Sequence, residues 1–160
     1  MNTEAYAAYD SALVYNSANL GALNNYAYYL SLERRDLDKA EEMSYKTVKS
    51  EPKNSTYLDT YAWILFEKGN YAEARLYIDD AIKNDKDQSD TILEHGGDIY
   101  YMTGDVDGAL KYWKQAQEMG SESKTLKKKI EKRNIYPNEN VTQQITERQA
   151  VFVCCLSCFS

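Results

Sequence analysis

EKGNYAEAR, residues 67–75, runs from helix-forming residues through a Lys-Gly-Asn turn into a second amphipathic stretch. MTGDVDGAL, residues 102–110, makes the same turn. Gly69 aligns with Gly104 and Ala74 aligns with Ala109, at a spacing of 35 residues in both cases. A shared register of this kind indicates an internal repeat, and periods of about 20 to 50 residues are typical of solenoid architectures.

Further copies of the pattern lie upstream. ERRDLDKAE places Arg35 and Ala40 at 34 residues before Gly69 and Ala74. A partial fourth copy is found near the start of the chain, 35 residues before the equivalent positions of the next copy. It consists of Ala5, Tyr9 and Ala12, which precede Ala40, Ser44 and Thr47. The repeat therefore extends over most of the chain.

One repeat can be interpreted as a helical hairpin. STYLDTYAWILFEK, residues 55–68, has apolar residues at offsets of three, four and seven, which is the spacing of one helical face. Gly69-Asn70 ends this helix, because both residue types adopt the left-handed conformation readily. A second helix is predicted over residues 71–84. Neither helix can bury its apolar stripe alone, so such hairpins are expected to stack. The two stripes are Leu58, Tyr61, Ala62 and Leu65, then Ala74, Tyr77, Ile78 and Ala81.

Together with the closing SEP at residues 50–52, this pattern resembles the tetratricopeptide repeat (TPR) family over about residues 2–120. The closing proline of the family pattern is present only at Pro52. The resemblance implies an all-α, right-handed solenoid of helical hairpins with a C-terminal capping helix.

The predicted TPR array covers residues 1–133, and a poorly ordered tail covers 134–160. The first copy supplies only a second helix, so the chain resembles the C-terminal part of a longer bacterial TPR protein. The array is divided into a half repeat at 2–17, repeats at about 20–53, 55–88 and 90–120, and a cap helix at 123–135.

The cap helix has Leu126 and Ile130 four residues apart, with lysines elsewhere. We expect its lysines to form a solvated face, and an anion-binding patch is the alternative. The tail ends in AVFVCCLSCFS, which is too short to span a membrane. Palmitoylation, self-association and an origin outside the natural reading frame remain open for this segment beside a tail without function.

Charge and composition exclude several classes of protein. The net charge is −6, with −9 over residues 1–121 and +4 over residues 122–133, so nucleic acid is a disfavoured partner. No run of 18 apolar residues and no signal peptide are present. We expect a soluble chain, cytoplasmic by default and exported if it belongs to a longer lipid-anchored protein.

In the TPR family the first helix of each hairpin lines a concave surface that receives a peptide or a partner helix. The resemblance therefore implies an aromatic and acidic binding face that favours a basic or neutral segment over a terminal carboxylate. Alternatively, Trp63 and Phe66 cover seams between hairpins. The candidate partner-binding residues are Asn24, Tyr28, Asp59, Trp63, Phe66, Glu94, Asp98 and Tyr101.

The sequence offers little for catalysis, and we predict no enzyme activity, cofactor or metal. His95 is the sole histidine and is interpreted as a surface or seam residue. TGDVDGALKYWK resembles part of a calcium loop, but Thr103 and Lys114 occupy the decisive ligand positions, so Asp105 is interpreted as a helix N-cap. The Cys155 and Cys158 pair lacks the second pair of ligands that a zinc site needs.

The predicted function is a protein–protein interaction scaffold. Two alternatives remain at this stage. The chain could be a structural segment of a longer array with no ligand of its own, or an accessory domain of an enzyme encoded upstream. No partner identity and no oligomeric state follow from the residues.

Overall fold

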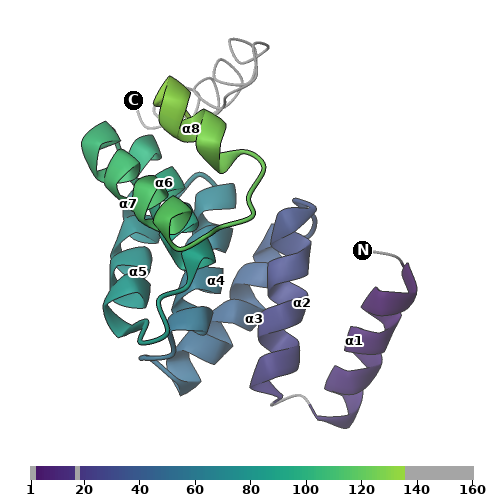
Figure 1. Ribbon diagram of the computed structural model, residues 1–160. Coiled ribbons are helices and arrows are strands. Elements are labelled where there is room, and N and C mark those ends of the chain that lie inside the picture. Colours follow the sequence, from purple (N-terminus) through teal and green to yellow (C-terminus); the bar gives the residue numbers. More distant parts are fainter. Residues whose placement is uncertain (1–2, 17–18, 136–160) are drawn as a thin grey trace, which may run out of the picture.

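The structure is a computed structural model that describes residues 3–16 and 19–135. These residues form helices without any strand, as Figure 1 shows, so the prediction of an all-α solenoid is confirmed. The helices are α1 (Thr3–Tyr15), α2 (Leu20–Leu32), α3 (Leu37–Ser50), α4 (Ser55–Glu67), α5 (Tyr71–Asn84), α6 (Asp90–Met102), α7 (Val106–Glu118) and α8 (Leu126–Lys132).

The helices pair into three hairpins, α2 with α3, α4 with α5 and α6 with α7 (Figure 1). Helix α1 packs against α2, and α8 packs against α7. Helix α2 also contacts α4, and α4 contacts α6, whereas α3, α5 and α7 make no comparable contacts with one another among the described helices. Because the first helices of neighbouring hairpins contact one another and the second helices do not, we call the side of α2, α4 and α6 the inner side of the stack.

The lengths of the turns within the hairpins explain why the second helices α3 and α5 begin 34 residues apart, whereas α5 and α7 begin 35 residues apart. Gly69 has φ 86° and Gly104 has φ 87°, the left-handed conformation expected where α4 and α6 end. In the first hairpin Arg34 takes this role with φ 52°, and the turn is one residue longer. Our alignment of Arg35 with Gly69 was therefore wrong by one residue.

Small residues bring the two helices of each hairpin together, as the repeat predicts. Ala40, Ala74 and Ala109 are completely buried at equivalent positions of α3, α5 and α7. One turn further along α7, Trp113 is also completely buried and fills the place that Ile78 has in α5. The core of the last hairpin is thus built around a much larger side chain.

The two ends of the array differ from its middle. At the N-terminus the rings of Tyr6 and Tyr9 lie 5.6 and 5.5 Å from that of Tyr26, so the half repeat packs on the next hairpin as expected. The side chains of Ala5 and Ala12 lie outside the described part of the structure.

At the C-terminus the cap helix, expected at 123–135, is the shorter α8. Its Leu126 and the following Ile135 are buried in the core of the last hairpin. The apolar tail and its cysteines lie outside the described residues. In the described part of the chain, no helix has the length and apolar character needed to cross a bilayer.

Candidate interaction surface

The structure buries half of the residues that the resemblance assigned to an open concave face. Their role in binding a partner stays a prediction, but their accessibility differs from what the sequence indicated. Asn24, Asp59, Phe66 and Asp98 are buried, whereas Tyr28, Trp63, Glu94 and Tyr101 are partly exposed.

Asp59 on α4 is paired with His95 on α6. The Nδ1 atom of His95 lies 2.9 and 3.1 Å from the two carboxylate oxygens of Asp59, and both side chains are buried. Burial lowers the pKa of His95, but the charge and hydrogen bond of Asp59 outweigh it, so the net pKa is raised. The histidine is therefore a seam residue, one of the two expected roles, and it carries positive charge over a wider pH range than a free histidine.

A second group of paired charges joins α8 to the inner side of α6. The ammonium of Lys129 donates to Glu94 Oε1 at 2.7 Å and to Asp98 Oδ2 at 2.8 Å. The other oxygen of Asp98 accepts a hydrogen bond from Trp113 Nε1 at 2.9 Å. Burial lowers the pKa of Lys129, but the two carboxylates outweigh it and raise the pKa overall.

This arrangement corrects the prediction that the lysines of the cap helix all face solvent. Lys127, Lys128 and Lys132 are exposed, but Lys129 is only 7% exposed. Lys129 lies in the expected cap helix, but its ammonium pairs with two carboxylates of α6 instead of facing solvent. We call these five residues, the pair of Asp59 with His95 and the group of Glu94, Asp98 and Lys129, the polar seam.

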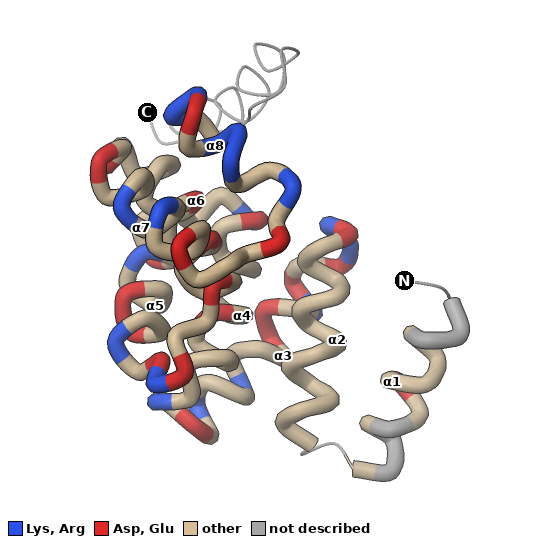
Figure 2. Tube along the Cα trace, in the orientation of Figure 1, with Lys and Arg blue, Asp and Glu red and all other residues tan. Residues whose placement is uncertain are grey.

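The polar seam changes the electrostatic character of the inner face. Each acidic residue that the sequence assigned to it, namely Asp59, Glu94 and Asp98, has a basic partner within the chain. With His95 protonated, the seam has a net charge of only about −1. Figure 2 shows acidic positions on α4 and α6 and several basic positions on α8. Free carboxylates are thus not the main feature of this surface.

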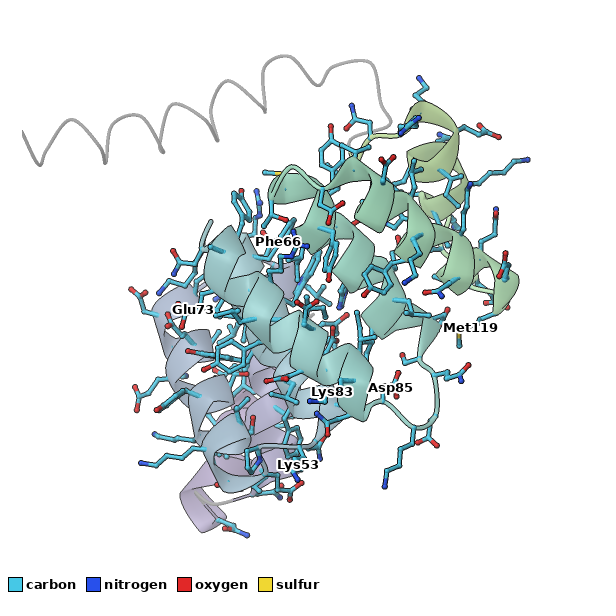
Figure 3. The ribbon with its side chains drawn as sticks, turned by 90° about the vertical axis from the view of Figure 1, so that its left-hand side faces the viewer. Lys53, Phe66, Glu73, Lys83, Asp85 and Met119 are labelled. Carbon is cyan, nitrogen blue, oxygen red and sulfur yellow. The ribbon has the colours of Figure 1, made fainter. Side chains whose placement is uncertain are left out.

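Aromatic rings lie against the His95 end of the polar seam. The ring of Trp63 stacks on that of His95 at 4.1 Å and on that of Phe66 at 4.7 Å. Tyr28 on α2 lies 6.3 Å from His95 on the same side. Phe66, labelled in Figure 3, is 2% exposed, and its ring contacts that of Tyr71 on α5 of the same hairpin. Tyr28 and Trp63 keep exposed edges, and we call these two residues the aromatic edge.

Two buried polar atoms of the inner face have no hydrogen-bond partner within the described residues. They are Oδ1 of Asn24, which is an acceptor, and Nε1 of Trp63, which is a donor. Unpaired buried polar atoms are uncommon in folded proteins and each costs about 1 to 3 kcal/mol. Both belong to residues that the resemblance assigned to the partner-binding face.

A separate hollow of about 460 Å³ lies where the connection from α5 to α6 approaches the end of α7. Asp85 and Met119, labelled in Figure 3, are on its rim. Its charged and amide side chains are all at least partly exposed, so it is a solvated surface depression. It is lined by Ile82, Asp85, Gln88, Leu93, Gln115, Glu118 and Met119.

Asp105 caps α7, as the sequence predicted. Its Oδ1 accepts a hydrogen bond from the backbone N–H of Gly108 at 2.9 Å, and its Oδ2 pairs with Arg75 at 2.9 Å. Within residues 3–16 and 19–135, no group of three or more histidine, cysteine or carboxylate side chains could hold a metal ion.

The raised pKa of His95 predicts a pH dependence of stability. A histidine whose pKa is raised by folding stabilises the folded state below about pH 6.5, and this contribution is lost as the pH rises through the folded pKa. We expect wild-type protein to lose stability over this interval relative to His95→Gln. Urea unfolding at a series of pH values measures the difference. Parallel curves for the two proteins would contradict the ion pair, since no other histidine is present.

Comparisons with known proteins agree with this architecture. The sequence model of a family described as "Tetratricopeptide repeat" matches residues 29–91 and 62–124. The first TPR domain of human RPAP3 superposes with a TM-score of 0.63 at 13% identity, covering 82% of this chain and 95% of that domain. A comparison with curated protein sequences returned no match.

Two further solved structures have the same fold. TTC0263, a TPR protein of Thermus thermophilus, gives a TM-score of 0.64 at 13% identity over 78% of this chain and 69% of its own. A chain in the structure of Naa15/Naa10 bound to HypK-THB gives 0.58 at 21% identity, over 69% of this chain and 17% of its own. At these identities the likeness concerns the fold alone.

Proposed function

This chain belongs to the tetratricopeptide repeat family, whose members are generally protein–protein interaction modules, and we propose that it holds a segment of a partner protein against the aromatic edge of its inner face. The contact residues are Tyr28 and Trp63. The chain acts as a scaffold and carries out no chemistry in this proposal.

The observation that carries the proposal is the contrast between paired carboxylates and partly exposed aromatic rings on one surface. Asp59, Glu94 and Asp98 each have a basic partner within the chain, which leaves a net charge of only about −1 for a basic segment to use. Tyr28 and Trp63 offer large, rigid apolar surfaces, which are the side chains that contribute most at protein interfaces. We therefore favour a neutral segment with an apolar anchor over a basic one.

The two buried polar atoms without a hydrogen-bond partner also favour a polypeptide segment as the ligand. Trp63 Nε1 is a donor and Asn24 Oδ1 is an acceptor, and a polypeptide backbone supplies both complementary groups. Small rotations of these side chains toward a bound segment would satisfy two groups that are otherwise unpaired. This gain adds to the burial of the ring edges.

Site-specific crosslinking tests the proposal. p-Benzoylphenylalanine at Tyr28 in the native cell is expected to capture one discrete partner protein, whereas the same group at Leu76 is not. Leu76 is the matched control because it is 67% exposed on α5, away from the inner side. Crosslinks that form from Leu76 and not from Tyr28 would place the contact on the outer surface.

Trp63→Ala is expected to weaken the purified complex by more than about 30-fold, since interface tryptophans contribute about 2 kcal/mol or more. Titration calorimetry with the captured partner measures the change, and circular dichroism checks that the variant is folded. Leu76→Ala serves as the control and is expected to leave the affinity unchanged. Equal affinities for the wild type and a folded Trp63→Ala variant would refute the aromatic edge.

A further inference from the structure

A hollow of about 360 Å³ lies between α3 and α4, and we call it the tyrosine hollow. Its walls include the rings of Tyr45 on α3 and Tyr61 on α4, which lie 5.9 Å apart and are inclined by 48°. The ring of Tyr77 on α5 stands edge-on to that of Tyr61 at 4.6 Å, so three consecutive helices each contribute one ring. The other wall residues are acidic, namely Asp38, Glu41 and Glu42. Aromatic rings beside carboxylates form a favourable environment for an organic cation.

The hydroxyl group of Tyr61 is the polar group of this hollow that lacks a partner. Tyr61 is only 5% exposed, and its hydroxyl forms no hydrogen bond with any residue that the structure describes. Burial, followed by the charge of Glu41, raises the pKa of Tyr61 to about 12, so the hydroxyl is neutral at physiological pH. Its oxygen can therefore accept a hydrogen bond from a cation in the hollow.

Tyr26 on α2 shows which group completes such an arrangement. It precedes Tyr61 by 35 residues and is equally buried, at 4% exposed. The ammonium of Lys39 donates a hydrogen bond to the hydroxyl of Tyr26 at 3.0 Å and lies 4.5 Å from the centre of its ring. The same ammonium donates to Oδ1 of Asp10 at 3.4 Å. A tyrosine at this repeat position thus binds an ammonium through its hydroxyl and its ring, beside a carboxylate.

The equivalent lysine is absent beside Tyr61. Lys39 directly precedes Ala40, and the residue that directly precedes the equivalent Ala74 is Glu73. Glu73, labelled in Figure 3, is exposed and forms no ion pair with any described residue. The charge is therefore reversed at the position from which the first repeat supplies its cation.

The charges around the hollow favour a cation from outside. The three wall carboxylates are paired with two lysines of the chain, Lys68 and Lys46. With Glu73, four carboxylates and two ammonium groups leave a net charge of −2 at this place. Neither lysine donates a hydrogen bond to Tyr61. A ligand with positive charge is therefore attracted to the hollow.

We propose that the tyrosine hollow binds a lysine side chain of a partner protein, whose ammonium donates a hydrogen bond to the Tyr61 hydroxyl and lies against the tyrosine rings. The bound lysine takes the place that Lys39 has at Tyr26. The hollow uses neither residue of the aromatic edge, so this proposal stands independently of the function proposed above.

A pair of peptides tests the ligand. The acetylated amide Ala-Lys-Ala is expected to shift the ring resonances of Tyr45, Tyr61 and Tyr77 in NMR spectra of protein that is isotope-labelled in its tyrosines. The matched peptide with norleucine lacks only the ammonium, and it is expected to bind at least about tenfold more weakly, since it loses the charge-assisted hydrogen bond and the cation–π contact. Equal binding of the two peptides would overturn the proposal. Tighter binding of n-butylammonium than of the lysine peptide would assign the hollow to a free amine instead of a partner protein.

Substitutions at two positions locate the bound ammonium. Glu73→Lys places a lysine where the first repeat has Lys39, so it is expected to fill the hollow from within and to weaken binding of the lysine peptide by at least about tenfold. Glu73→Gln is the matched control, which removes the charge without filling the hollow, and a loss of less than about fivefold is expected. Tyr61→Phe retains the ring and is expected to weaken binding by at least about fivefold through loss of the hydroxyl. Equal affinities of Glu73→Lys and Glu73→Gln, or wild-type affinity of Tyr61→Phe, would contradict the assigned site.

Discussion

Replacing Lys129 with methionine is expected to lower the free energy of unfolding of the last hairpin by about 3 to 5 kcal/mol, since removing one partner of a buried ion pair leaves an uncompensated charge. Methionine retains most of the length and apolar surface of the lysine stem. Glu94 and Asp98 lose the ammonium that donates to both of them. Urea unfolding measures the loss, and amide exchange in α8 locates it.

The neighbouring lysine provides the matched control. Lys128 is exposed on the same helix, so Lys128→Met is expected to change stability by no more than about 0.5 kcal/mol. Adding Asp98→Asn to Lys129→Met is expected to restore part of the loss, because the amide is neutral and its oxygen still accepts from Trp113 Nε1. A Lys129→Met variant as stable as Lys128→Met would show that the pair contributes nothing.

The helices and their turns could be predicted because their determinants are local. Gly69 and Gly104 are needed where the backbone turns left-handed, and the buried alanines are needed where two helices approach. Each such residue is also repeated, so one position supports the interpretation of the next. The predicted alignment of the repeats was wrong only in the first turn. There Arg34 adopts the left-handed conformation that Gly69 and Gly104 have in the later turns.

The accessibility of the inner face could not be predicted in the same way, because it depends on pairs between repeats. Asp59 is paired with His95, which lies 36 residues later, and Glu94 is paired with Lys129, which lies 35 residues later. The sequence contained a signal in the second case. Lys129 follows Asn24, Asp59 and Glu94 at the same spacing of 35 residues, so it occupies the equivalent position in the cap helix. When a basic residue occupies the repeat position that is acidic in the preceding repeat, the two side chains can pair with each other instead of forming a binding face.

Gly97→Ala is expected to be among the most damaging single-methyl changes in the chain, with a loss of about 2 to 3 kcal/mol from overpacking. A Cβ atom at position 97 would lie 2.3 Å from the ring of Trp113, far inside contact distance. The tryptophan ring is rigid, completely buried and hydrogen-bonded to Asp98, so it cannot move aside cheaply. The loss exceeds the gain of about 1 kcal/mol that alanine brings to a helix interior.

The preceding repeat suggests how the damage can be repaired. There the pair equivalent to Gly97 and Trp113 is Ala62 and Ile78, and both are completely buried. Trp113→Ile alone leaves a cavity, but combined with Gly97→Ala it reproduces that pair, so the double variant should be more stable than the sum of the single losses predicts. Gly21→Ala is the control, since its Cβ would meet only Asn19 at 3.6 Å. Strict additivity of the two changes in urea unfolding would mean that glycine is not needed here to accommodate the tryptophan.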